Sequence, residues 1–221
     1  METKAVEAVI SLSSGIQLRG FLDTTENPRG LIAFVHGSGS SRYSTRNNQV
    51  AHYLRQRGFA TLLMDLLTMH EDQIDSMTQE SRFNIPMLGH RVAEVIDCLE
   101  ARDDVGSLPI GLFGASTGAA AALLAAALRP NRVAAIVSRG GRPDLVGDAL
   151  TTIDVPTLFV VGSEDVHVLE LNRMAMNRMH GTKQLITIQG ATHLFEERGA
   201  LEQVAEHAAS WYSHYLVAEK A

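Results

Sequence analysis

The segment G-A-S-T-G, residues 114–118, places a serine between two glycines where a short apolar run meets an alanine-rich run. A G-x-S-x-G pattern at a strand-to-helix junction is typical of a tight, strained turn that exposes a nucleophilic serine. The glycines avoid collisions as the chain folds back, and the alanines let the helix lie close to the strand. Such pentapeptides also occur in purely structural turns, so the pattern alone leaves both interpretations open.

Ser116 needs a base within hydrogen-bonding reach, because an alkyl hydroxyl is a poor nucleophile at neutral pH. His193, in "GATHLFEE" after the last apolar run, is the expected base. Asp165, which follows the preceding apolar run, is the carboxylate expected to orient the imidazole. Two alternatives stay open: the adjacent Glu164 takes that role, or Asp165 only caps the following helix.

An oxyanion formed at Ser116 needs two backbone N–H donors. One is expected from Thr117, the residue after the nucleophile, and the other from the "HGSG" loop at residues 36–39. Ser38 is the expected donor there, because the glycines on each side let its peptide turn inward. His36, at the end of a strand, is expected to brace the loop and not to act as a base.

Two pairs of arginines each follow an apolar run. Arg42 and Arg46 follow the run that leads into the "HGSG" loop, and Arg139 and Arg142 follow the next apolar run after the helix that begins behind Ser116. Guanidinium groups placed there are suited to hold a carboxylate or phosphate of a substrate. The alternative is that they pair with acidic side chains such as Asp144 or are solvated. The pattern therefore predicts a substrate-binding rim that selects anions, with this alternative open.

These residues need a scaffold that brings distant strand ends together. Apolar runs alternate with amphipathic segments, after an alternating pair that indicates an antiparallel hairpin. This predicts an α/β fold, a mostly parallel sheet of about eight strands with helices on both faces, whose ligands bind beyond the carboxyl ends of the strands. The expected strands are residues 4–12, 16–24, 30–37, 59–66, 109–115, 133–140, 156–162 and 183–190, and the expected helices are 47–58, 85–104, 117–129, 144–151, 167–180 and 199–217.

Length and composition favour a single domain over residues 1–221 with no large lid, since 221 residues with 45% hydrophobic and 20% charged residues suit one core. The net charge of −6, with acids and bases interspersed, argues against nucleic acid as a partner. The apolar runs are too short to span a bilayer and the N-terminus lacks a signal pattern, so we expect a cytoplasmic protein without a membrane partner. A monomer or a homodimer is expected.

The polar stretch at residues 68–84 is the only candidate cap over the site, and it is expected to be a short linker. Its His70, Glu71, Asp72 and Asp75 lack partners at metal-ligand spacing and are expected to be solvated. The single cysteine, Cys98, excludes an internal disulfide and a cysteine-rich metal site. No metal and no cofactor are expected.

The motifs "FVHGSGSS", "LFGASTGAAAALLAAA", "VVGSEDVHVLELN" and "GATHLFEE" resemble the α/β-hydrolase superfamily, in particular its small dienelactone hydrolase-like branch. The resemblance implies ester or lactone hydrolysis without a cofactor. Dienelactone hydrolases proper carry cysteine where this chain has Ser116, so the resemblance points toward esterase-like and peptidase-like members.

The sequence thus predicts a serine hydrolase that acts on small carboxylic esters or lactones through an acyl-enzyme. Two alternatives from other classes stay open. One is an acyl transferase or perhydrolase that uses the same triad, and the other is a non-catalytic binding module that keeps the fold.

Overall fold

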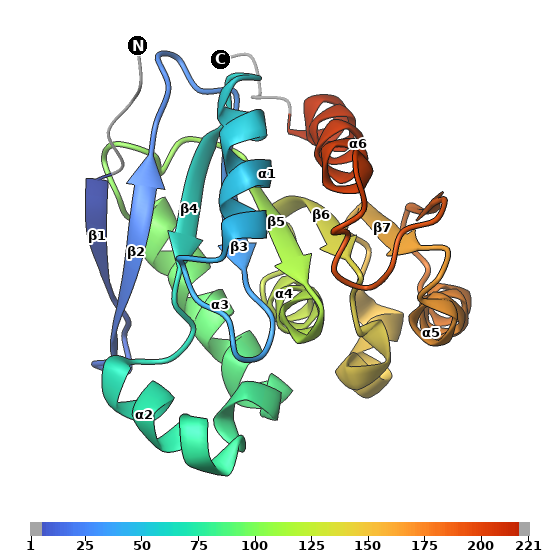
Figure 1. The fold of residues 1–221 in the computed structure, drawn as a ribbon. Helices are drawn as coiled ribbons and strands as arrows, with labels where there is room; N and C mark the ends of the chain where they lie inside the picture. Colours follow the sequence, from blue (N-terminus) through green and yellow to red (C-terminus); the bar gives the residue numbers. More distant parts are fainter. Residues whose placement is uncertain (1–5, 217–221) are drawn as a thin grey trace.

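A computed structural model describes residues 6–216 of the chain (Figure 1). These residues form one mixed sheet of eight strands, flanked by helices. The strands lie in the order β1-β2-β4-β3-β5-β6-β7-β8. β2 pairs antiparallel with both β1 and β4, and all other neighbours are parallel. The strands are β1 (Val6–Ser11), β2 (Gln17–Asp23), β3 (Leu31–Val35), β4 (Ala60–Met64), β5 (Ile110–Ala115), β6 (Val133–Arg139), β7 (Thr157–Gly162) and β8 (Lys183–Ile188).

Helices cover both faces of this sheet, which confirms the predicted fold class. Successive residues of β3 point to opposite faces, as a pleated strand requires: Ala33 packs with α3 and α4, and Phe34 packs with α1 and α6. The helices are α1 (Thr45–Arg55), α2 (Met69–Thr78), α3 (Ile85–Glu100), α4 (Thr117–Leu128), α5 (Val166–Arg178) and α6 (Ala200–Tyr215), with 3₁₀ segments η1 (Ser81–Phe83) and η2 (Pro143–Thr152). Residues 4 and 5 of the first expected strand and residue 217 of the last expected helix lie outside the described residues.

Small residues set the distance between α4 and the sheet. A Cβ on Gly114 would lie 2.4 Å from the Cα of Ala119, and one on Gly118 would lie 2.2 Å from the carbonyl oxygen of Val35. Both distances are far below van der Waals contact, so only glycine fits at either position. The glycines and alanines around Ser116 therefore fix the close packing of helix on strand that the sequence predicted.

The stretch at residues 68–84 differs from the expected polar linker, because it contains α2 and η1. Thr68 and Glu71 form a reciprocal capping box at the start of α2, which satisfies two free N–H groups. The expected helix at 144–151 also differs, since it is a 3₁₀ segment interrupted at Gly147, whose φ is 67°.

Candidate active site

Ser116 sits at the sharp turn between β5 and α4 with φ 51° and ψ −123°. A non-glycine residue with positive φ is strained, and such strain persists only where the surroundings hold it. Here the backbone N–H of Ser116 donates to the carbonyl of Arg139 on the neighbouring strand (3.1 Å), while its side chain makes no capping hydrogen bond to α4. The turn therefore leaves the Ser116 hydroxyl free to face the carboxyl edge of the sheet.

Two further side chains reach Ser116 from distant segments. His193 Nε2 lies 3.3 Å from Ser116 Oγ, and His193 Nδ1 lies 2.6 Å from Asp165 Oδ2. Asp165 stands at the N-cap position of α5 but makes no side-chain capping bond there. Glu164 instead accepts a hydrogen bond from the hydroxyl of the adjacent Ser163. The structure thus brings together the three residues expected from the sequence, with Asp165 rather than Glu164 at the imidazole.

The expected oxyanion donors are also neighbours. The backbone N–H of Ser38 donates to the Thr117 hydroxyl at 2.9 Å, a contact that the sequence did not predict. A Cβ on Gly37 would lie 3.0 Å from the Ala115 carbonyl and 3.1 Å from Ser116 Cβ, so the loop passes directly over the turn at Ser116. The first turn of α4 lies beneath, and its positive dipole end favours negative charge.

His36 lies buried beside this loop and bonds on both sides of its ring. Its Nδ1 is 2.9 Å from the carbonyl of Gly37, and its Nε2 accepts from the N–H of Leu66 at 3.1 Å. Burial lowers the pKa of His36, against a smaller opposing effect of the bond to Gly37. The neutral ring therefore ties the end of β3 to the end of β4, as expected of a bracing residue.

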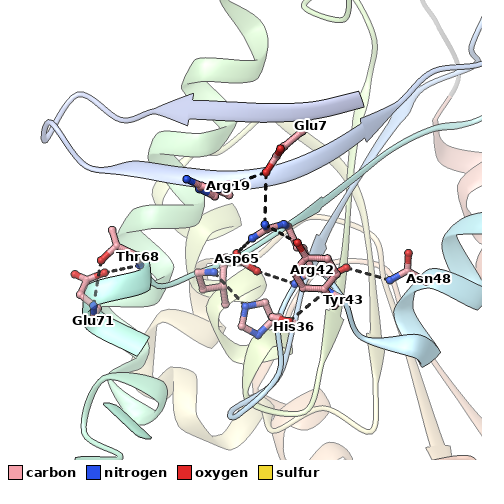
Figure 2. A network of polar contacts seen from close by, with 11 residues as sticks. Glu7, Arg19, His36, Arg42, Tyr43, Asn48, Asp65, Thr68 and Glu71 are labelled. Atoms are coloured by element: carbon pink, nitrogen blue, oxygen red, sulfur yellow. Dashed lines mark hydrogen bonds and ion pairs between the residues drawn. The ribbon is translucent and has the colours of Figure 1, made fainter. Parts of the chain in front are cut away.

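Arg42 lies at the centre of a polar network near His36 (Figure 2). Its guanidinium pairs with Asp65 and donates to the hydroxyl of Tyr43 at 2.8 Å, and its backbone N–H donates to Asp65 Oδ1 at 2.8 Å. Glu7 adds a longer ion pair at 3.6 Å, and the ring of Phe21 lies 5.2 Å from the guanidinium carbon. The two Nη groups of Arg42 are thus engaged within the protein, while its Nε is buried without a partner among the described residues.

The other three arginines of the predicted rim differ in their partners. Arg142 forms a bidentate pair with Asp144 at 2.7 and 2.8 Å, and Arg46 pairs with Glu196 at 3.1 Å. Arg139 is 8% exposed, and within residues 6–216 no hydrogen bond or ion pair reaches its guanidinium. Three of the four arginines therefore pair with a carboxylate, as the alternative interpretation expected, and Arg139 does not within the described residues.

A cavity of about 320 Å³ opens next to the loop at residues 36–39. Ser38 and Thr117 line it on one side, and Tyr43, Met69 and Leu88 contribute apolar surface. Its remaining walls come from the ends of β2 and β4 and from α2 and η1. The stretch expected to be a short linker is thus a wall of this cavity.

Two acids of α2, Glu71 and Asp75, are paired, which corrects the expectation that they are solvated, whereas His70 and Asp72 are exposed as expected. Glu71 forms a bidentate pair with the buried Arg91, which lowers the pKa of Glu71 to about 2 although burial opposes the shift. Asp75, only 1% exposed, pairs with Arg82 of η1 and accepts its backbone N–H. The capping motif Thr68-x-x-Glu71 was the sequence signal that would have revealed this helix.

Residues 6–216 contain no cluster of three or more His, Cys, Asp or Glu side chains placed to hold a metal ion. Over the same range, every helix is too short or too polar to cross a bilayer.

Known proteins resemble this chain in sequence and in fold. A family model described as "Serine aminopeptidase, S33" matches residues 26–141. The crystal structure of a dienelactone hydrolase from Anabaena variabilis ATCC 29413 is 46% identical, with a TM-score of 0.95 over 98% of this chain and 100% of that one. Est1E from Butyrivibrio proteoclasticus has the same fold at 19% identity, with a TM-score of 0.78 over 96% and 99% of the two chains.

Two Mycobacterium tuberculosis proteins, from strains CDC 1551 / Oshkosh and ATCC 25618 / H37Rv, are each 49% identical over 210 residues. Both carry the name "Putative phosphoribosyl transferase". The match covers 95% of this chain but 46% of each relative, so the chain spans about half the length of these proteins. The family model and the near-complete overlay on the Anabaena enzyme confirm the resemblance in the sequence motifs. This chain belongs to the α/β-hydrolase superfamily, in its dienelactone hydrolase-like branch.

Proposed function

We propose that this hydrolase cleaves small carboxylic esters or lactones through an acyl-enzyme on Ser116. The observation that carries the proposal is the continuous contact from Ser116 Oγ through the His193 ring to Asp165 Oδ2. A nucleophile in reach of a base, with the base oriented by a third group, is the general requirement for activating a hydroxyl.

In the acylation step, Ser116 Oγ bonds to the ester carbonyl carbon as His193 Nε2 takes the hydroxyl proton. The carbonyl electron pair moves onto the oxygen, and Asp165 stabilises the imidazolium that forms. The tetrahedral intermediate then breaks its bond to the alcohol oxygen, which takes the proton from His193 and leaves as the alcohol. A water molecule repeats the sequence on the acyl-enzyme and releases the acid and Ser116.

The oxyanion is proposed to accept hydrogen bonds from the backbone N–H groups of Ser38 and Thr117. Preorganised donors of this kind contribute on the order of 10²–10³ in kcat. In the structure the Thr117 hydroxyl accepts a hydrogen bond from the Ser38 N–H. A substrate oxyanion would replace that hydroxyl as the acceptor, so the donor is held in place before substrate arrives.

The cavity beside the oxyanion loop supports small substrates. Its volume of about 320 Å³ is at the low end of small-molecule sites, and charged side chains such as Asp72 and Arg82 contribute to its lining. A long acyl chain would place apolar surface against these charges, which is unfavourable.

Two other functions remain candidates for this site. An acyl transferase or perhydrolase would form the same acyl-enzyme and differ only in whether an alcohol or peroxide replaces water. A binding module would keep the fold without turnover. The phosphoribosyl transferase name of the two mycobacterial relatives belongs to proteins about twice as long, and the contacts around Ser116 favour acyl transfer for the matched part.

A fluorophosphonate probe and a set of 4-nitrophenyl esters test the proposal. We expect the probe to label Ser116 and the acetate and butyrate esters to be hydrolysed faster than the decanoate. Added methanol or hydrogen peroxide separates the alternatives, because a transferase forms the methyl ester or peracid in preference to the acid. Absence of labelling and turnover in folded protein would favour the binding module.

A further inference from the structure

Asn172 of α5 is a fully buried amide whose hydrogen-bonding capacity is only partly used. Its side chain is 0% exposed, and its Nδ2 donates to the carbonyls of Val168 at 2.7 Å and Gly141 at 2.9 Å. Its Oδ1 accepts no hydrogen bond from residues 6–216. A buried polar atom without a partner is unfavourable, so an apolar side chain would serve packing at least as well. What the amide adds is its pair of donor contacts.

Gly141 belongs to the segment at residues 139–142, which holds the backbone of Ser116 from both sides. The N–H of Ser116 donates to the carbonyl of Arg139, and the carbonyl of Ser116 accepts from the N–H of Arg142, each at 3.1 Å. Ser116 has a positive φ, and such strain persists only where the surrounding structure enforces it. The segment is therefore part of what keeps Ser116 in its exposed conformation.

The same segment packs against the base. A Cβ on Gly140, whose φ is 51°, would lie 3.4 Å from both Cε1 and Nδ1 of His193. Gly141 is packed more closely still, because a Cβ there would lie 2.0 Å from Ser138 Oγ and 2.7 Å from Ala119 Cβ. No side chain fits at Gly141 unless its neighbours move. A displacement of the Gly141 peptide would therefore be transmitted to the imidazole.

The helix α5 carries both the acid of the triad and this amide. Asp165 stands at its N-cap, and Asn172 follows seven residues later, about two helical turns along the same side. The helix packs against η2, the segment that continues from residues 139–142 (Figure 1). One rigid element thus sets the position of Asp165 and, through Asn172, that of the segment in contact with Ser116 and His193.

We propose that Asn172 is a positioning residue of the triad, whose hydrogen bond to the Gly141 carbonyl keeps Ser116 and His193 aligned with Asp165. This inference rests on the proposed ester hydrolysis and adds a residue that the reaction depends on without contact to substrate. Alignment is sensitive to small movements, since a displacement of about 1 Å can cost on the order of 10²-fold in rate. Reacting groups are held this precisely only when buried hydrogen bonds fix their supports.

The first test is Asn172→Leu, which keeps the branched shape of the side chain and removes both donor contacts. We expect kcat and kcat/KM for 4-nitrophenyl acetate to fall together, about ten- to a hundredfold, with KM nearly unchanged, because alignment in the transition state is lost and ground-state binding is not. Leu99→Ala, a buried position in the last turn of α3, is the control that lowers folding stability away from the site. Its kcat should stay within about twofold of the parent. Equal losses of kcat in the two variants would contradict the inference.

A second variant, Asn172→Asp, tests the donor itself. A protonated carboxyl can still donate to the Gly141 carbonyl, and burial beside two carbonyl oxygens favours that form. We expect kcat at neutral pH to lie between those of the parent and Asn172→Leu. As pH rises and the introduced carboxyl ionises, kcat should fall while that of the parent stays level, with circular dichroism at each pH to show folded protein. A profile that stays level like that of the parent would contradict the donor role.

A proton NMR measurement separates failure of this inference from failure of the proposed function. The Nδ1–H proton of His193, in its 2.6 Å contact with Asp165, is expected to resonate at low field whether or not an ester is turned over. A shift or loss of this resonance in folded Asn172→Leu, with no change in Leu99→Ala, supports the inference even if the parent hydrolyses no ester. An unchanged resonance, or a kcat within about twofold of the parent, overturns it. If Asn172→Leu does not fold, the pH profile and the resonance of Asn172→Asp decide in its place.

Discussion

Arg42 and Arg139 are equally buried arginines, and their surroundings are opposite. Each is 8% exposed and each lies near the carboxyl edge of the sheet. Arg42 is enclosed by Asp65, Tyr43 and Glu7, whereas Arg139 meets no carboxylate within the described residues. One guanidinium thus links strand ends through ion pairs, and the other is buried without an ion pair among the described residues.

Ser116→Ala is expected to cause the largest loss of activity, because it removes the hydroxyl that is proposed to attack the ester. Ester hydrolysis should fall by a factor on the order of 10⁴ or more, since members of a triad act as a unit. The free energy of unfolding should change little. Steady-state kinetics with urea unfolding of the same preparation measures both. Turnover close to that of the parent protein would remove the assignment of Ser116.

Asp165→Asn should follow, with Glu164→Gln as its matched control in the adjacent position. Asparagine keeps the shape but favours the wrong tautomer of His193, so kcat should drop on the order of 10⁴-fold. Glu164 contacts the Ser163 hydroxyl rather than the imidazole, and its variant should stay within about threefold of the parent. A pattern in which only the glutamine variant is crippled would transfer the acid role to Glu164.

Stability measurements on Arg42→Met and Arg139→Met compare the two buried arginines directly. Losing Arg42 leaves Asp65, whose side chain is 18% exposed, without its cation, and we expect the free energy of unfolding to fall by about 2–4 kcal/mol. Losing Arg139 removes an unpaired buried charge, so the free energy of unfolding should change by less than about 1 kcal/mol or should rise. Urea denaturation with equal m-values is the measurement. A larger loss for Arg139→Met than for Arg42→Met would reverse the comparison.

The proximity of Ser116, Asp165 and His193 could be predicted because parallel strands end at one edge. Ser116, Asp165 and His193 follow different apolar runs, and any parallel arrangement of those runs brings their ends to the same edge. The glycines and alanines around Ser116 added a local packing signal that the observed distances explain.

Asp144, two residues from Arg142, was foreseen as a partner, but the partner of Arg42 could not be predicted because it depends on strand order. Asp65 follows β4, and β4 lies beside β3 in the sheet, which brings Asp65 to Arg42 across 23 positions of sequence. Nothing local distinguishes Arg42 from Arg139 in this respect. The helix α2 was missed for another reason: its mixed polar composition hides an ion pair of Glu71 with Arg91, 20 residues away.

The smallest expected effect is the pH dependence of the free energy of unfolding that His36 causes. Burial lowers the pKa of His36 in the folded protein, whereas the unfolded chain takes up the proton near pH 6.5. Below that pH the unfolded state binds more protons, so the free energy of unfolding should decrease as pH falls and level off above it. One group contributes a slope of at most about 1.4 kcal/mol per pH unit. His36→Gln should flatten the profile between pH 5 and 6.5 by up to that amount in urea unfolding, and His52→Gln, which changes an exposed histidine of α1, is the control. Identical slopes in the parent and His36→Gln would mean that the ring does not act as a neutral brace between β3 and β4.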